Sequence, residues 1–580
     1  MMKIFSLGTS FRWLNTTQFL GALNDNVFKL LMINFLIAAT AGPTAGGIAG
    51  VASLLFAVPF LLFTPAAGAL ADRYSKRDIV VATKVLEIVV MLVGAAAFWV
   101  GQPALLYVTL FLMSVQSAVF GPSKYGIIPE LVPRDAISRA NGQLVMFTYL
   151  AIILGTVLGP QLAHWLEGRY FWASLACVAI AVAGTLASLG IGRTPAGGRP
   201  ARTSLLFWQG ATRVLREFRH DRHLIVAMYG YAYFSVVGAF LQAAVIQYGM
   251  ERLGYSSVQA TTLFLYAALG IAGGGWLAGR WSGRNIEFGI VPVGALLIAG
   301  STAWLAVGAH SLVAVAIGLF LAGVGSGLYV VPLEAFLQWR SPPERRGEIV
   351  ATGGFLSWVG VFVGALLCTV ALGALKWSAA QGFMLLSVMT LVLGVFSLKV
   401  LPDFFIRFVA MLLTRVVYRL RALGLENLPV EGGALLVSNH VSYMDALQIL
   451  AVQQRRIRFL MHRSIYEGSR LKPLFKLMGV SPIAMEDPPK KIVESLREAR
   501  RWLDEGFMVC IFAEGALTRT GLTQGFRPGF ERIVRDSRHP IIPVYIGGTW
   551  GSIFSHYYGK QTLRMPSQFP YPVTVMFGAP

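Results

Sequence analysis

Residues 68–77 have the sequence GALADRYSKR and join two apolar segments of the chain, 46–70 and 79–100. Each segment has the length of roughly 20 residues that an α-helix needs to cross the hydrocarbon core of a bilayer. An acid, Asp72, follows the first segment directly, and a cluster of basic residues follows the acid. A turn this short and this charged predicts a tight connection between two membrane helices at one membrane face.

The same alternation of long apolar segments and short polar loops continues from Asn15 to Leu401. Only 13% of the 580 residues are charged, about half the share that is usual in a soluble domain. We expect twelve spans, near residues 15–40, 46–70, 79–100, 104–122, 143–166, 170–191, 223–249, 257–279, 288–308, 311–333, 349–372 and 378–401. After Leu401 the composition becomes mixed, which predicts a polytopic membrane protein with a C-terminal globular domain.

The formal net charge of +21 is concentrated in alternate loops. The intervening loops 40–47, 101–104 and 308–311 contain no Lys or Arg. This asymmetry predicts that both termini and the C-terminal domain are cytoplasmic, and it argues against a nucleic-acid partner. The basic loops are 73–77, 134–139, 193–222, 280–284 and 340–346.

The basic central loop 193–222 divides the spans into two sets of six, 1–192 and 223–402. Residues 275–284, GWLAGRWSGR, occupy the same place in the second set as GALADRYSKR in the first. The correspondence indicates parallel repeats related by an axis along the membrane normal. Gly279 stands where the first copy has its acid, so any latch made by the second copy should be weaker.

Residues 68–77 match the pattern G-x-L-x-D-R-x-x-[RK]-[RK], and the first 400 residues thereby resemble the major facilitator superfamily. The resemblance implies an all-α, twelve-span transporter and a conformational latch made by Gly68, Asp72, Arg73 and Arg77. We expect Asp72 to pair with a nearby arginine and to accept hydrogen bonds from amides at a helix N-terminus. Simple anchoring of the basic residues at the membrane face is the alternative.

Four further stretches resemble the bacterial lysophospholipid transporter family: GALNDN at 21–26, KYGIIPEL at 124–131, ANG at 140–142 and VPLEAFLQ at 331–338. They contain polar residues inside or near apolar segments. Because such residues usually face a cavity and contact a substrate or coupling ion, we expect that role for Asn24, Asp25, Asn26 and Glu334. Structural hydrogen bonding is the alternative for the first three, and surface placement for Glu334.

The region after Pro402 begins with segment 403–424, whose apolar and basic residues have helical spacing and predict an interfacial helix on the membrane. Residues 425–580 have the pattern of an α/β domain. Its expected helices are 446–453 and 490–505, and its expected strands are 434–438, 458–461, 480–485, 507–512, 541–546 and 573–577.

A candidate catalytic pair lies in SNHVSYMD, residues 438–445. His440 follows a predicted strand and Asp445 begins a predicted helix. A carboxylate beside an imidazole fixes its tautomer and stabilises its protonated form, so that the imidazole can take a proton from an attacking hydroxyl. A solvated loop histidine beside a helix-capping Asp445 is the alternative.

The same region contains FAEG at 512–515, TRTG at 518–521 and IPV at 542–544, and the order of these motifs resembles the glycerolipid acyltransferase family. The resemblance implies that His440 is the general base and Asp445 its partner. It implies an acyl-acceptor site made of Asn439, Ser442, Glu514, Gly515 and Arg519. It also implies no bound metal or cofactor, with the acyl thioester of acyl carrier protein or of coenzyme A as co-substrate.

The chain departs from that family at the residues expected to bind phosphate. Ala516-Leu517 replace the usual Thr-Arg, Ala513 replaces Pro, and Met485 stands where many members have Arg. These losses argue against a phosphomonoester acceptor and favour a lysophospholipid with a larger head group. The candidates for contact with its phosphodiester are Lys490, Lys491 and Arg527.

Taken together, the two regions resemble bacterial fusions of a lysophospholipid transporter with a 2-acylglycerophosphoethanolamine acyltransferase. The resemblance implies a bifunctional inner-membrane protein that imports lysophospholipid and re-acylates it in the cytoplasmic leaflet. Two alternatives stay open: a transporter of another class, such as drug efflux, with a fused acyltransferase, or an acyltransferase with spans that only anchor it. Arg455, Arg456 and Arg458 form either a docking surface for an acidic carrier protein or a solvated basic face.

Overall fold

The computed structural model describes residues 7–39, 45–196, 207–283, 286–400, 402–429, 432–453, 455–484, 486–559 and 568–580. The chain folds as two compact units, Met1–Ser397 and Leu398–Pro580. Part of the central loop, 197–206, and the departure at Met485 lie outside the described residues.

The first unit is a helix bundle. Twelve helices in its described part are long and apolar enough to cross a membrane, which confirms the expected number of spans. They are built on α1 (Thr9–Ala39), α2 (Ala45–Arg73), α3 (Lys76–Val100), α4 (Pro103–Gly126), α6 (Ile137–Trp165), α7 (Tyr170–Leu189), α9 (Arg222–Leu253), α11 (Phe264–Ser282), α12 (Ile290–Val307), α13 (Leu312–Arg340), α14 (Arg346–Cys368) and α15 (Ala379–Val400), with the short helices α5 (Ile128–Leu131) and α10 (Ser257–Thr262).

The turn between α2 and α3 is as tight as its sequence predicts. Helix α2 ends at Arg73, and Ser75 caps α3 by accepting a hydrogen bond from the Asp78 amide. Such a cap satisfies one of the amides that the first turn of a helix leaves unpaired. The polar residues of GALADRYSKR therefore end one membrane helix and start the next within a few residues.

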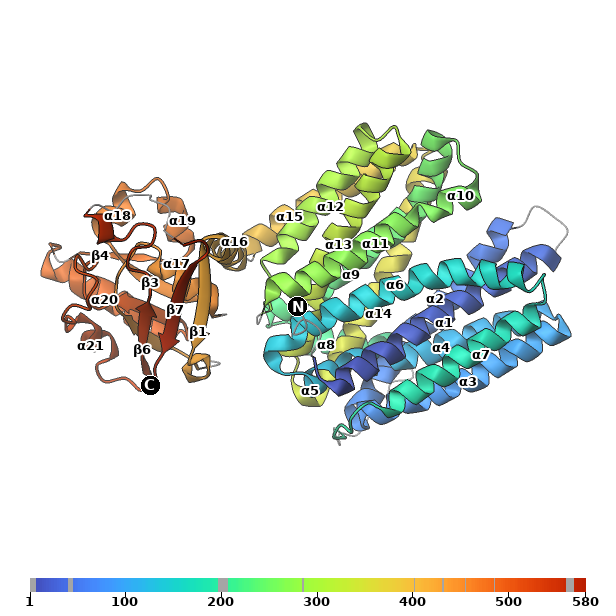
Figure 1. Cartoon of the computed structure of the whole chain (residues 1–580), viewed down its shortest axis with the longest axis horizontal. Coiled ribbons are helices and arrows are strands. Elements are labelled where there is room, and N and C mark those ends of the chain that lie inside the picture. The colour runs from blue at the N-terminus through green and yellow to red at the C-terminus, as the bar shows by residue number, and fades with distance from the viewer. Residues whose placement is uncertain are drawn as a thin grey trace. The chain divides into compact units, whose positions relative to one another are not determined.

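The bundle has two halves, α1–α7 in blue to teal and α9–α15 in green to yellow (Figure 1). Glycines allow the halves to touch, because a Cβ on Gly142 of α6 would lie 2.5 Å from the carbonyl oxygen of Gly275 in α11 and 3.1 Å from Cα of Gly279. The residue that replaces the acid in the second motif, Gly279, is therefore a packing contact between the halves. Helix α8 (Phe207–Glu217), from the central loop, ion-pairs through Glu217 with Arg345 at 2.5 Å.

The second unit is a seven-stranded sheet in the order β1-β7-β6-β2-β5-β3-β4, covered by helices (Figure 1). All neighbouring strands are parallel except β6 and β7. The strands are β1 (Tyr418–Leu423), β2 (Ala434–Ser438), β3 (Ile457–His462), β4 (Ser481–Ile483), β5 (Met508–Phe512), β6 (Ile541–Gly547) and β7 (Tyr571–Phe577), and the helices are α16 (Pro402–Val417), α17 (Asp445–Val452), α18 (Arg463–Gly468), α19 (Lys472–Leu477), α20 (Pro489–Asp504) and α21 (Gly529–Val534).

Segment 403–424 is not one helix as expected. Helix α16 ends at Val417, and the next six residues form β1, an edge strand of the sheet. Tyr418, the first residue of β1, is buried, whereas Arg419 and Arg421 are exposed. Side chains on opposite faces of a strand differ in this way when one face of the sheet is covered. The four-residue spacing of Arg415 and Arg419 had the period of a helix, but pairing with β7 determines the conformation.

Candidate functional site

Asp72 joins the two halves of the bundle. Its carboxylate accepts hydrogen bonds from the first amides of α14, Gly347 N at 2.6 Å and Glu348 N at 2.8 Å. Gly68 lies one turn earlier in α2, and a Cβ there would come within 2.7 Å of the Gly347 carbonyl oxygen. The missing side chain at Gly68 thus lets α2 approach α14, and Asp72 caps the positive N-terminal end of that helix.

The two arginines of the motif make contacts of their own. Arg73 is exposed and its guanidinium lies 5.1 Å from the centre of the Tyr74 ring. Arg77 donates from Nε to the Ile191 carbonyl oxygen, just after α7, at 3.4 Å. Arg77 therefore holds the α2–α3 turn against its own half of the bundle.

A second polar contact joins the halves beside this end of the bundle. The amides of Asn141 in α6 and Gln338 in α13 exchange two hydrogen bonds, at 2.8 and 2.7 Å, and both side chains are buried. In a reciprocal amide pair each side chain both donates and accepts, which offsets the cost of burying the two amides. Any motion that separates the halves here must break both bonds.

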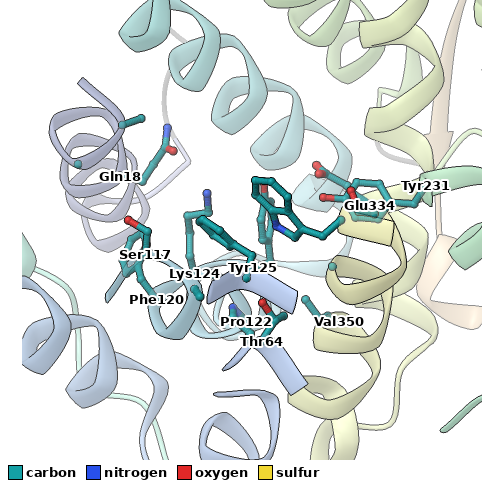
Figure 2. A pocket seen from close by; sticks show the side chains of 18 of the residues that line it. Gln18, Thr64, Ser117, Phe120, Pro122, Lys124, Tyr125, Tyr231, Glu334 and Val350 are labelled. Atoms are coloured by element: carbon teal, nitrogen blue, oxygen red, sulfur yellow. The ribbon is translucent and has the colours of Figure 1, made fainter. Parts of the chain in front are cut away.

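A cavity of about 350 Å³ lies between the halves and is lined by side chains from both. Figure 2 shows Gln18 and Lys124 on one side and Glu334 with Tyr231 on the other. Glu334 is buried, and the hydroxyls of Tyr231 and Tyr125 lie within hydrogen-bonding reach of its carboxylate. Lys124 stacks over the Tyr125 ring at 4.4 Å. The cavity is thus lined by groups of both charges.

Of the three polar residues expected to face a cavity in α1, only Asp25 lines it. Ser117 Oγ donates to Asp25 at 2.8 Å. Asn24 is fully buried and donates to Glu87 at 2.8 Å, and Asn26 donates to the Ala22 carbonyl oxygen at 2.8 Å and packs beside Gly155 of α6. Successive residues of a helix point about 100° apart, so three in a row cannot share one face.

Sequence reasoning did not single out a buried ion pair in α3. Lys84 Nζ lies 2.6 Å from Glu87 Oε2, and each side chain is 2% exposed. Lys84 also lines the cavity. The sequence could have indicated this pair, because two charged residues lie inside a segment of membrane-spanning length. Charges inside a membrane are costly and usually functional.

His440 and Asp445 form a contact at the carboxyl end of β2. His440 Nδ1 lies 2.9 Å from Asp445 Oδ2, which also accepts from the amides of Val441 at 2.6 Å and Ser442 at 2.8 Å. The imidazole stacks on Phe512, with ring centres 4.0 Å apart. Asp445 is fully buried, whereas the His440 side chain is 18% exposed. With Nδ1 directed at the carboxylate, Nε2 is the nitrogen left to exchange protons.

Glu514 binds the backbone of this histidine. Its Oε1 accepts from the His440 amide at 2.9 Å and its Oε2 from the Gln524 amide at 3.0 Å, and the side chain is buried. Strands β2 and β5 are parallel neighbours, so the loops after them meet at one edge of the sheet. Both carboxylate oxygens accept hydrogen bonds from the backbone, so Glu514 fixes the loop that carries His440, and its contact with an acceptor stays a prediction.

Asn439 and Ser442 also bond to the backbone, and their expected part in the acyl-acceptor site stays a prediction. Asn439 exchanges two hydrogen bonds with the backbone of Ile546 in β6, at 3.0 and 2.8 Å. Ser442 Oγ donates to the Ile553 carbonyl oxygen at 2.8 Å, and both side chains are buried. Because buried polar groups must find internal partners, these residues fix the loop that carries His440.

Gly515 and Arg519 are both exposed, unlike the other residues expected at the acceptor site. Gly515 has φ of +75°, and a Cβ there would lie 3.0 Å from Arg527 Nε. Arg527 in turn donates from its amide to the Ala513 carbonyl oxygen at 2.9 Å. The turn after β5 thus presents guanidinium groups from Arg519 and Arg527 at the surface.

A family model for the Major Facilitator Superfamily matches residues 14–365. The chain belongs to the major facilitator superfamily. A second family model, described as acyltransferase, matches residues 419–547. This superfamily member is therefore a multi-pass membrane protein that carries an acyltransferase domain, and the two matches fall in separate compact units.

Curated relatives match the superfamily region. The lysophospholipid transporter LplT of Salmonella paratyphi B is 30% identical over 330 residues, which cover 56% of this chain and 78% of that protein. The lysophospholipid transporter LplT of Enterobacter sp. (strain 638) is 29% identical over 335 residues, 56% of this chain and 79% of its own length.

Solved structures share the fold of this superfamily unit. The human organic anion transporter MFSD10 superposes with a TM-score of 0.54 at 18% identity, over 67% of this chain and all of its own. The transporter FucP in its outward conformation gives a TM-score of 0.55 at 15% identity, over 67% of this chain and 97% of its own. At this identity the likeness concerns the fold alone.

The thiol nearest the histidine in this superfamily member is not suited to catalysis. Cys510 is fully buried in β5, and burial raises the pKa of its thiol well above the ordinary value. A thiolate nucleophile is thereby disfavoured at neutral pH. The structure therefore offers no activated thiol in β5 beside the His440–Asp445 contact.

The arginine run expected to dock a carrier protein has internal partners. Arg455 donates to three carbonyl oxygens, of Pro429 at 2.9 Å, Gly432 at 2.6 Å and Gly506 at 2.7 Å. Arg456 and Arg458 lie over the Phe507 ring, at 5.4 and 4.8 Å from its centre. Arg455 is therefore not part of a solvated basic face, because its guanidinium connects three loops by hydrogen bonds.

We predict that Arg455→Ser lowers the stability of the acyltransferase unit by about 2 kcal/mol, because three carbonyl groups lose a charged donor. The temperature of half-inactivation of acyl transfer in detergent measures the effect. Arg456→Ser is the control and should change that temperature less. A stable Arg455→Ser protein that has lost transfer only from the carrier-protein thioester would restore the docking interpretation.

Proposed function

We propose that this protein moves a lysophospholipid, with lysophosphatidylethanolamine as the leading candidate, across the bacterial inner membrane and re-acylates it in the cytoplasmic leaflet. The observation that carries the proposal is the presence, in one chain, of a charged cavity between transporter halves and a His–Asp pair with a buried carboxylate in an acyltransferase domain. The relatives described as lysophospholipid transporters support the substrate class. The basic loops support the cytoplasmic position of the second unit.

The cavity suits a zwitterionic head group. Asp25 and Glu334 each have a buried carboxylate oxygen without a hydrogen-bond partner in the described part of the chain. Lys124 lies on the same cavity. Because buried polar atoms need partners, an ammonium group would satisfy a carboxylate and a phosphodiester would satisfy Lys124. An acyltransferase that used its spans only as an anchor would have no need of these costly charges.

Release toward the cytoplasm requires the halves to separate at the contact end. The bonds from Asp72 to α14 and the Asn141–Gln338 pair hold this end closed in the present structure. Breaking them while the opposite end closes gives the alternating access that parallel-repeat transporters use. The lysophospholipid then reaches the cytoplasmic leaflet, since its acyl chain is too apolar to wait in water.

The chemistry in the second unit is acyl transfer. His440 Nε2 takes the proton of the free glycerol hydroxyl as its oxygen attacks the thioester carbonyl carbon. The tetrahedral intermediate expels the thiolate, which receives that proton from the imidazolium, so diacyl phospholipid and free thiol leave. Asp445 stabilises the imidazolium and keeps Nε2 directed outward. The acyl donor is the thioester of acyl carrier protein or of coenzyme A.

Helix α16 offers the surface by which the acyltransferase unit meets the membrane. Leu412, Leu413 and Val416 are exposed on it, with Leu413 59% exposed. Arg407 is not part of a membrane-facing basic side, because it is buried and donates to the Gln453 carbonyl oxygen at 2.9 Å. An apolar helix face of this kind binds at the headgroup boundary, where the acceptor lipid is found.

A proteoliposome assay tests the proposal. Labelled lysophosphatidylethanolamine is added outside vesicles that contain the protein and an internal acyl thioester, and labelled diacyl product is followed. Product should form with the wild-type protein and not without internal thioester. Uptake of a drug-like substrate with no lysophospholipid uptake would overturn the transport half, and transfer without uptake would leave only an anchored acyltransferase.

A further inference from the structure

A lone lysine, Lys29, lies in α1 about 15 Å along the helix from its end at Ala39. No acidic partner for it exists among the residues that the structure describes; its contact is with Phe56 of α2, whose ring centre is 5.3 Å from Nζ. A charged side chain at this depth in a membrane helix is costly and marks a functional site by default. The Lys84–Glu87 pair in α3 shows how a structural charge is neutralised in this bundle, and Lys29 has no such arrangement.

Lys29 lies one helical turn beyond the cavity, on the face of α1 that lines the cavity. In α1, Gln18, Ala22 and Asp25 line the cavity, and Lys29 continues this row at the next i+4 position. In α2, Phe60 and Thr64 line it, and Phe56 precedes them by one turn on the same face. The contact between Lys29 and Phe56 therefore extends both rows to the same level.

Aromatic rings from both halves of the bundle lie next to the contact between Lys29 and Phe56. Phe60 of α2 stacks on Trp358 of α14 with ring centres 4.4 Å apart, and Phe56 lies 6.2 Å from the same indole. Phe60 and Trp358 also line the cavity, and they belong to opposite halves of the bundle. A cation beside an apolar aromatic wall has the chemistry to hold an anionic group whose molecule continues as an apolar chain.

We propose that Lys29 is a separate anion-binding station for the phosphodiester of the lysophospholipid, placed before the cavity on the side away from the Asp72 contact. The phosphodiester pairs with Lys29 while the acyl chain lies against Phe56 and Trp358, and the head group then passes the aromatic pair toward Lys124. The inference rests on the proposed function, because the anion it names is that of the transported lipid. With Lys29, the transport path has two binding sites for the phosphodiester instead of the cavity alone.

Uptake kinetics of Lys29→Gln in proteoliposomes test the station, with labelled lysophosphatidylethanolamine as the probe. Loss of one charged hydrogen-bond donor should raise KM about tenfold and change the maximal rate less than twofold. Lys29→Arg keeps the charge and should restore KM to within twofold. Removing an unpaired charge from a membrane helix does not endanger folding, and an unchanged elution volume and melting temperature of the purified protein in detergent check this.

Each result decides between readings. An unchanged KM in Lys29→Gln overturns the station. So does a lost maximal rate at constant KM, which would place Lys29 in the conformational cycle instead. An equal defect in Lys29→Arg and Lys29→Gln would show a steric role. If the wild-type protein takes up no lysophospholipid, the proposed function itself fails and the lipid assignment of Lys29 fails with it.

Discussion

His440→Ala should lower acyl transfer to added lysophosphatidylethanolamine by about 10²–10⁴-fold, the usual cost of losing a positioned general base. Uptake of the same lipid should be unchanged, because His440 and the transport cavity lie in different compact units. Initial rates of diacyl product in detergent measure the first effect. Uptake into proteoliposomes without an internal thioester measures the second.

A matched control is His462→Ala. His462 ends the parallel strand β3, bonds Ser464 at 2.8 Å and is not part of the His–Asp contact, so its replacement should change the rate less than twofold. Asp445→Asn should reduce transfer strongly as well, because an amide can present a donor to Nδ1 and favour the wrong tautomer. Full activity of His440→Ala would remove the catalytic assignment, whatever the controls show.

The features that the sequence predicts well are those set by local composition. Twelve spans follow from the length of apolar segments, because a bilayer has a fixed thickness. The His440–Asp445 contact also follows, since a loop that ends in a helix N-terminus brings residues five apart together and Asp445 accepts from the intervening amides. The tight connection between α2 and α3 is local in the same sense, because Ser75 caps α3 two residues after α2 ends at Arg73.

The features that it did not predict depend on distant partners. Asn141 and Gln338 are 197 residues apart in the chain, and no pattern in either segment indicates their pairing. The direction of Asn24 toward Glu87 is set by how α1 rotates against α3. Likewise β1 is a strand because β7 lies beside it. Motif membership marked Asn439 as part of a site, but only the neighbouring strand β6 shows that its amide is occupied.

Asp72→Ala should slow lysophospholipid uptake by about 10–100-fold and leave acyl transfer in detergent unchanged. The carboxylate accepts two amide hydrogen bonds from α14, and each charged bond contributes about 1.5–3 kcal/mol. Their loss destabilises the state closed at this end relative to the open one. A transporter that must pass through both states slows when one of them is depopulated. Initial uptake rates at saturating lipid measure the change.

Two variants separate this explanation from a general effect of charge. Asp72→Asn keeps one carbonyl oxygen to accept from α14, so its uptake rate should fall between those of the wild type and Asp72→Ala. Asp78→Ala removes an acid that is exposed at the start of α3 and whose ion pair among the described residues is with the neighbouring Arg77, so it should be nearly neutral. Equal slowing in Asp78→Ala and Asp72→Ala would mean that the charge of the turn matters and its bonds to α14 do not. Slowing of acyl transfer in well-folded Asp72→Ala would contradict the independence of the two units, since Asp72 has no direct part in the acyltransferase chemistry.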